Sequence, residues 1–200
     1  MNNNSMWSLK LSTAAIVLIP VAIGINYLGK LFAGLLKLPL WLDAIGTVLA
    51  SMLAGPIIGA SAGVINNLIY GVTVDPISTV YALTSGVIGL LVGIMAYKGW
   101  ISNLGKAIVT GLLVGLIAAT VSTPLNIIFW GGQTGNVWGD AFYAFLINKD
   151  LPTWLASFGN SIIVDVPDKV ATVIIAYLLF RGLPKTLTNI YRSNEEIEQL

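Results

Sequence analysis

The sequence predicts an all-α integral membrane protein, a bundle of six membrane-spanning helices. Two observations predict this fold class. Hydrophobic residues make up 56% of the 200 residues and charged residues 10%, and the mean hydropathy is +0.85. Because soluble domains carry about a quarter charged residues, this chain has too little polar surface for a soluble globule. Apolar runs close to the length that crosses a bilayer also recur along the chain.

The apolar runs, taken in order with Gly and Pro as breaks, predict six spans. These spans cover residues 11–32, 41–54, 57–70, 80–97, 107–130 and 162–180. Pro20 is expected to kink the first span. The break at Gly55-Pro56 leaves the second and third spans short for a bilayer about 30 Å thick. We expect these two to tilt little, to thin the membrane or to be partly re-entrant.

Three parts follow from this reading: an N-terminal cytoplasmic segment (1–10), a six-span transmembrane domain (11–182) and a cytoplasmic tail (183–200). The first apolar run continues without a small-x-small cleavage site, so we predict a span rather than a secretory signal. The long connection 131–159 carries several aromatic residues and is expected to lie over the interface or to cover a cavity. Within it, Asp140 to Ile147 could form a short interfacial helix.

Lys and Arg residues in short loops predict the orientation. If both termini are cytoplasmic, six of these residues lie inside and three outside, which favours a multi-pass protein of the plasma membrane with that orientation. The inside set is Lys10, Lys98, Lys106, Arg181, Lys185 and Arg192, and the outside set is Lys30, Lys37 and Lys149.

The residue types also exclude classes of function. The chain has no Cys and no His, which removes disulfides, thiol nucleophiles, ordinary zinc sites and His-based acid–base catalysis. Its net charge of +1 provides no basic surface for nucleic acid. We therefore expect no enzyme, no cofactor and no metal site.

The last predicted span contains charges that are costly in a bilayer. Asp165 and Lys169 stand one helical turn apart, acid before base, so they can neutralise each other on one face. One interpretation is a structural ion pair. The other is a hydrated pocket that uses these groups on a solute, because ionisable residues inside spans usually face a cavity and have a function.

Polar residues of the predicted spans gather in the halves nearest the outside, and the inner halves are almost purely apolar. A solute pocket open to the outside would collect polar groups in this way. Residues near helix ends also reach interface water, and this alternative stays open for Asn26, Tyr70 and Tyr81. The candidate substrate-binding residues are Asn67, Tyr81, Asn126, Trp130, Asn160, Asp165 and Lys169.

Glycines recur at every fourth position in several spans. Gly55, Gly59 and Gly63 are followed by the pairs Gly89/Gly93 and Gly111/Gly115. Such small faces let helices approach closely, which we expect to serve packing within the chain, with a partner interface as the alternative.

Several stretches resemble the substrate-binding S component of an energy-coupling factor (ECF) transporter. They are Leu40-Trp-Leu-Asp43-Ala-Ile-Gly46-Thr47, Ala54-Gly-Pro56-Ile-Ile-Gly59-Ala, Asn66-Asn67-Leu-Ile-Tyr-Gly71, and the ending from Asp168-Lys169 to Leu183-Pro184-Lys185. The resemblance covers essentially the whole chain. It implies a small six-helix protein that captures a vitamin or vitamin precursor from outside, in a cavity built by spans four to six and capped by outer loops.

The resemblance also implies partners: a transmembrane T subunit and two cytoplasmic ATPase subunits, with toppling in the membrane to release the solute inward. Many members dock through an Ala-x-x-x-Ala face on the first helix. That pattern is absent here in strict form, and Ala14, Ala15 and Ala22 provide a looser small-residue face.

Other functions remain open at this stage. A stand-alone secondary transporter or small channel could use Asp165, Asp168 and Lys169 for coupling, with Pro167 breaking the helix. A sensor module would need an output domain after Arg181, where about nineteen residues follow. A membrane enzyme with a divalent ion would rest on the weak Asp165-x-x-Asp168 spacing. For the solute, a B6 vitamer, a pyrimidine precursor and pantothenate are equally compatible with these residue types.

Overall fold

The computed structural model describes residues 13–197, with side chains described through Tyr191. The predicted N-terminal segment 1–10 lies outside the described residues. Every regular element in the described range is helical, which confirms the all-α class. The elements are α1 (Thr13–Leu35), α2 (Ile45–Thr73), the 3-10 helix η1 (Pro76–Thr79), α3 (Ala82–Tyr97), α4 (Leu104–Trp130), α5 (Val137–Ile147), α6 (Thr153–Gly182) and α7 (Lys185–Ile197).

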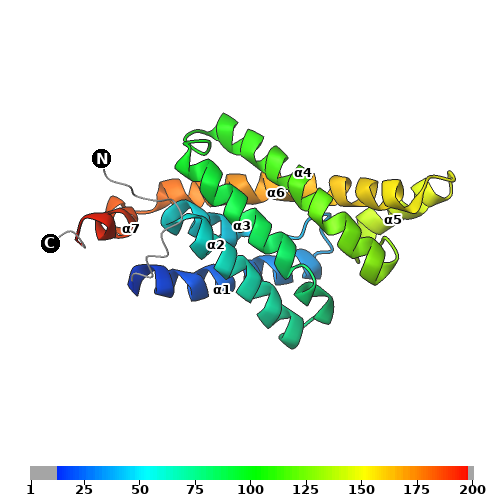
Figure 1. Cartoon of the computed structure of the whole chain (residues 1–200), viewed down its shortest axis with the longest axis horizontal. Coiled ribbons are helices and arrows are strands. Elements are labelled where there is room, and N and C mark those ends of the chain that lie inside the picture. Colours follow the sequence, from blue (N-terminus) through cyan, green and yellow to red (C-terminus); the bar gives the residue numbers. More distant parts are fainter. Residues whose placement is uncertain (1–12, 198–200) are drawn as a thin grey trace.

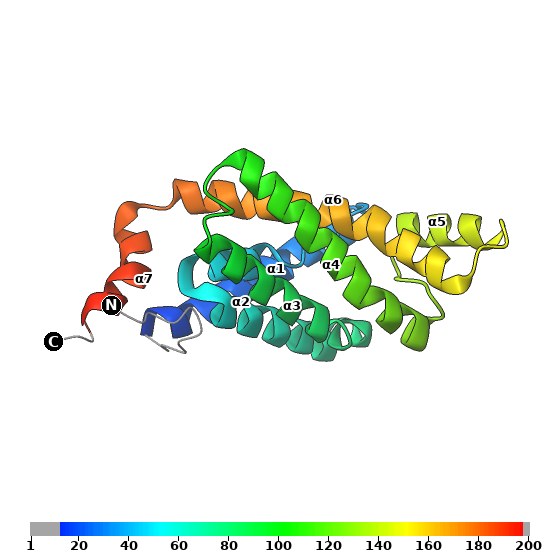
Figure 2. The same ribbon diagram turned by 45° about the horizontal axis from the view of Figure 1, so that its top comes forward.

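Helix α6 runs along the long axis of the molecule and organises the other helices (Figure 1). Helix α4 packs along α6, and α3 packs along α2, with α1 against the same α2. Helices α5 and α7 lie at opposite ends of α6, as both ribbon views show (Figure 2). The connection before α6 and the chain after it therefore mark the two ends of the bundle.

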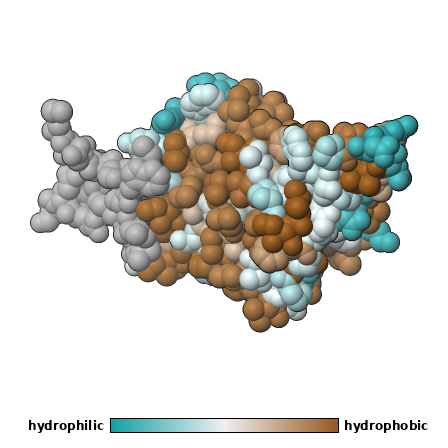
Figure 3. Space-filling model, turned by 45° about the vertical axis from the view of Figure 1, so that its right-hand side comes forward, coloured by the Kyte–Doolittle hydropathy of each residue, from teal (hydrophilic) through white to brown (hydrophobic). Residues whose placement is uncertain are grey.

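Three helices, α1, α2 and α4, are long and apolar enough to cross a membrane by length and composition. This is consistent with a membrane protein. Large apolar side chains are exposed on them, including Leu28, Leu35 and Ile128. Figure 3 shows hydrophobic residues over the middle of one face and hydrophilic residues toward its right-hand end and upper edge. The count of six crossings stays a prediction.

The predicted second and third spans form one element, α2, that folds back on itself at Gly55. Gly55 has a φ of 86° inside the helix, in the left-handed region that favours glycine, and Pro56 follows it. A Cβ on Gly59 would lie 2.9 Å from the Cα of Ser51, and one on Gly63 would lie 3.1 Å from Thr47 Oγ1. Residues farther before Gly55 thus meet residues farther after it. The two halves of α2 are therefore antiparallel, and the predicted tight break is confirmed.

Two boundaries differ from the sequence prediction. Helix α6 begins at Thr153, well before the predicted start of the sixth span at residue 162, because residues 153–161 pack a polar face inward. Ser157 and Asn160 are buried there, so a count of apolar residues misses this turn of helix. The tail forms helix α7, whereas Asp140–Ile147 lies within α5 as expected.

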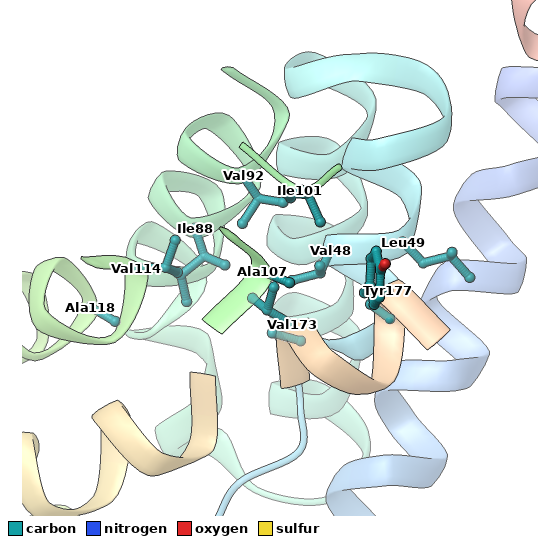
Figure 4. Close-up of a cluster of buried hydrophobic side chains, with 12 residues drawn as sticks. Val48, Leu49, Ile88, Val92, Ile101, Ala107, Val114, Ala118, Val173 and Tyr177 are labelled. Carbon is teal, nitrogen blue, oxygen red and sulfur yellow. The ribbon is translucent and has the colours of Figure 1, made fainter. Parts of the chain in front are cut away.

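The main apolar cluster lies between α2, α3, α4 and α6. Its side chains point toward one another in Figure 4, and the fully buried ones include Val48, Val92, Val114 and Val173. Glycines on α4 make this packing possible: a Cβ on Gly111 would lie 2.6 Å from the Cα of Val170. The α4–α6 contact therefore depends on the absence of a side chain.

We predict that Gly111→Leu lowers the free energy of unfolding by about 3 kcal/mol, because an added side chain forces α4 away from α6. The measurement is thermal unfolding of the detergent-purified protein. Gly24→Leu is the matched control, since Gly24 lies on α1 with no atom within 4 Å of an added Cβ. Equal melting temperatures for the two variants would contradict the close approach of α4 and α6.

Candidate functional site

A cavity of about 610 Å³, counting the space at its open mouth, lies among the helices. It is lined by the last turns of α1 and α4, the segment before α2, η1, the first turns of α3, and the middle of α6. Charged residues of its wall are Lys30, Asp43, Asp75, Asp165 and Lys169. The cavity thus collects ionisable groups from elements far apart in the sequence.

Asp168 is the buried centre of the charged wall. Its Oδ1 accepts hydrogen bonds from the backbone N–H groups of Trp41 at 3.0 Å and Leu42 at 2.8 Å, and its Oδ2 pairs with Lys169. Leu42 has a φ of 51°, a left-handed conformation that costs about 1–2 kcal/mol for a residue with a Cβ. The carboxylate of Asp168 therefore holds a strained segment of backbone against α6.

Lys169 joins this network to the cavity. Its ammonium group lies 3.3 Å from Asp43 Oδ1 as well as beside Asp168. No ion pair between Lys169 and Asp165 within 4 Å occurs in the described part of the chain, so Asp43 and Asp168, rather than Asp165, are the direct ion-pair partners of Lys169, while Asp165 attracts it from a longer distance. The reason is geometric, since the carboxylates of Asp168 and Asp43 approach Lys169 more closely than the one a full turn earlier.

Asp43 lies in the segment between α1 and α2. Burial acts to raise the pKa of its carboxyl group, but the ammonium groups of Lys169 and Lys30 outweigh burial and lower the pKa below its ordinary value. Asp43 is therefore held as a carboxylate at the cavity wall.

Asn26 fixes the other side of the same segment. It is fully buried on α1, and its Oδ1 accepts the backbone N–H groups of Gly46 at 2.7 Å and Thr47 at 3.2 Å. Its amide nitrogen donates to Thr47 Oγ1 at 2.9 Å. Asn26 thus satisfies the free N–H groups at the first turn of α2, where no side chain of the helix itself provides a cap.

Neutral polar side chains form another part of the wall. The Tyr81 hydroxyl donates to Asn126 Oδ1 at 2.5 Å, and the Asn126 amide donates to Ser161 Oγ at 3.0 Å. Thr84 and Ser122 are hydrogen-bonded to each other at 3.2 Å and both line the cavity. This wall offers hydroxyl and amide groups already oriented by the protein.

The cavity has an apolar floor. Ile88 and Ala118 line it, and both belong to the main apolar cluster (Figure 4). Below them the cluster consists of aliphatic side chains and Tyr177, whose hydroxyl accepts a hydrogen bond from Arg181. Polar walls above an apolar floor make the cavity a site that is closed at one end.

A second cavity, of about 670 Å³ with its open space, adjoins the first. The two share Lys30, Trp41 and Asp75. Its roof is the end of the α4–α5 connection and the first turn of α5. There Trp138 Nε1 donates to the carbonyl of Lys37 at 3.0 Å, and Asn136 Nδ2 donates to that of Leu38 at 3.3 Å. The 36–44 segment is therefore tied to α6 on one side and to α5 on the other.

Four of the seven predicted binding residues line the first cavity together: Tyr81, Asn126, Asp165 and Lys169. The other three lie behind its walls. Asn67 donates to Ser85 Oγ at 2.5 Å, Asn160 donates to Asp140 Oδ1 at 3.0 Å, and the Trp130 side chain approaches Tyr81. The structure therefore brings the deep polar residues of α4 and α6 to one place and assigns the remaining three a supporting position.

The predicted docking residues lie on α1. Ala15 and Ala22 are 3% and 1% exposed and belong to a cluster with Ala50 and Ala62 of α2, while Ala14 is partly exposed. Ala15 and Ala22 therefore pack within the chain and are not accessible to a partner. Their small side chains serve the α1–α2 contact, since a Cβ on Gly46 would meet the backbone of Ala22.

Four charged or aromatic residues of the cavity wall were not among the predicted binding residues: Lys30, Trp41, Asp43 and Asp75. Lys30 donates to Ser78 Oγ at 2.6 Å and lies 4.4 Å from the centre of the Tyr70 ring. A signal for Lys30 was present, because it interrupts the first apolar run. Trp41 stands two residues before Asp43 in a stretch already singled out, but nothing local showed that both face α6.

Within the described residues, no group of three or more carboxylate, His or Cys side chains is arranged to hold a metal ion. No protein family, curated protein or solved structure that we compared matches the chain. Fixed donors, acceptors and aromatic rings around an enclosed volume can replace the water around a small polar solute.

We predict that Asp168→Asn lowers the free energy of unfolding by about 3 kcal/mol, because it leaves the buried Lys169 without its nearest counter-charge. Denaturant or thermal unfolding of the purified protein measures this. Asp150→Asn is the control, since Asp150 is exposed and asparagine tolerates its φ of 57°. If both variants unfold like the unsubstituted protein, Asp168 does not hold the 36–44 segment.

Proposed function

We propose that the chain is the solute-capture subunit, or S component, of an ATP-driven ECF importer. In this proposal it crosses the membrane six times with both termini cytoplasmic. It binds a water-soluble vitamin or vitamin precursor from outside, and it docks on a T subunit that carries two ATPases.

The observation that carries the proposal is the shared cavity. Asn126, Asp165 and Lys169 reach it from two helices, and Ile88 and Ala118 close its floor. A polar pocket that is deep at one end of an apolar bundle is what capture from one side of a membrane requires. A channel would instead need a polar path through the floor.

The outer surface supports the same function. Apolar side chains are exposed along α1 and α4, while Asp168, Lys169 and Asn126 are at most 3% exposed. A subunit that reorients in the bilayer needs this separation, since each charge turned toward lipid costs several kcal/mol. The packing of Ala15 and Ala22 against α2 means that docking on a T subunit uses another face.

A stand-alone secondary transporter is the second candidate. Its supporting observation is the break at Gly55, because secondary transporters often bind solutes at the ends of discontinuous helices. Neither Gly55 nor Pro56 lines the cavity, however, so the helix ends at this break do not face it. This favours the capture subunit.

We predict that the purified protein retains a small solute that mass spectrometry identifies, and that Asn126→Ala lowers the retained amount about tenfold. Losing one buried hydrogen-bonding side chain costs about 1–2 kcal/mol of binding free energy, which corresponds to that factor. Thr120→Ala is the control, since Thr120 is exposed on the same helix and bonds only to the carbonyl of Leu116.

Equal retention by Asn126→Ala and the unsubstituted protein would overturn capture in this cavity. Reconstitution in liposomes separates the two candidates. Accumulation of the identified solute by the chain alone supports the secondary transporter, and accumulation that requires ATP and the partner subunits supports the capture subunit.

A further inference from the structure

The charges around the cavity do not balance. Four carboxylates, on Asp43, Asp75, Asp165 and Asp168, line it or pair directly with its wall, against two ammonium groups, on Lys30 and Lys169. A further carboxylate, on Asp140, bonds to Thr134 in the roof. Among the described residues around the cavity, carboxyl groups therefore outnumber ammonium groups.

Both ammonium groups are already occupied by the protein. Lys169 pairs with Asp168 and Asp43. Lys30 donates to Ser78, lies over the Tyr70 ring, and has Asp43 and Asp75 as its nearest charged partners of opposite sign. An anionic solute would have to compete for these contacts.

Asp165 differs from the other carboxylates of the wall. Its residue is 8% exposed, it faces the cavity, and it forms no ion pair within 4 Å in the described part of the chain. The indole of Trp41 approaches its carboxyl group, and the Lys169 ammonium attracts it from beyond ion-pair distance. No hydrogen bond to the Asp165 carboxyl oxygens within 3.5 Å occurs among the described residues, so these oxygens are available to a group in the cavity.

Aromatic rings accompany this carboxylate. Trp41 and Tyr81 line the same volume, and an aromatic face attracts a cation within about 6 Å, more strongly when water is excluded. A buried carboxylate with open acceptor positions, flanked by two rings, is complementary to a protonated nitrogen rather than to an acid.

From this arrangement we infer that the solute carries a positive charge, an amine or protonated ring nitrogen that Asp165 binds between Trp41 and Tyr81. The inference rests on the proposed function and narrows it. Among the solutes compatible with the sequence, it favours one with a basic nitrogen over a carboxylate such as pantothenate.

The sign of the electrostatic potential in the cavity can be measured without knowing the solute. The chain has no Cys, so Ser122→Cys introduces a single thiol into the cavity wall. Two methanethiosulfonates of similar size serve as probes, one ending in trimethylammonium and the other in sulfonate. Each forms a disulfide with the thiolate and releases methanesulfinate. The rate at which each reagent modifies Ser122→Cys is divided by its rate with Ser102→Cys, an exposed position on the connection between α3 and α4. This corrects for the different intrinsic reactivities of the two reagents.

We predict that the cationic probe modifies Ser122→Cys about tenfold faster than the anionic one after this correction, because a cleft of one sign concentrates counter-ions. We expect that adding Asp165→Asn to Ser122→Cys reduces this preference for the cationic probe several-fold. Asp75→Asn, at the mouth, does so as well and provides a second variant if the first fails to fold. Lys30→Gln, which removes a positive charge, increases the preference.

A preference for the sulfonate probe, or an unchanged ratio in both aspartate variants, overturns the cationic solute while leaving an open capture cavity intact. If neither probe modifies Ser122→Cys, the cavity is not accessible, and both this inference and the proposed function fail.

Discussion

The structure depends on one buried ion network, in which Lys169 bridges Asp168 and Asp43. Burying these charges is costly, and the cost is offset only because every member has partners. Asp168 also accepts two backbone N–H groups from the 36–44 segment, which carries the left-handed Leu42. The network therefore connects α6 to the chain between α1 and α2 and fixes the side of the cavity where charges meet.

The division between polar and apolar ends follows from this constraint. With Lys169 directed at Asp43, the charged face of α6 points toward the cavity, and the next turns of α6, with Val173 and Tyr177, complete the apolar cluster. The folded-back α2 fills the space beside them with a short half that is buried from Ile45 to Ser51. This apolar cluster thus separates the charged and amide side chains of the cavity from the opposite end of the bundle.

Much of this arrangement could be predicted from the sequence, because the signals were local. Gly55-Pro56 indicated the break in α2, and the charges of residues 165–169 indicated a polar face on an apolar helix. The partners of Lys169 could not be predicted, since helical spacing favours Asp165, whereas one partner, Asp168, is the preceding residue and the other, Asp43, lies 126 positions away in the sequence. The start of α6 was missed because its first turns bury hydroxyl and amide groups rather than apolar ones.

The central claim is that the cavity opens to the outside while the opposite end of the bundle faces the cytoplasm. Single thiols at Ser122, in the cavity wall, and Ser102, between α3 and α4, test it in intact cells with a membrane-impermeant reagent. The account predicts that the reagent modifies Ser122→Cys in intact cells, and that it modifies Ser102→Cys only after the membrane is permeabilised. Modification of Ser102→Cys in intact cells, with Ser122→Cys protected until the membrane is permeabilised, would contradict this orientation.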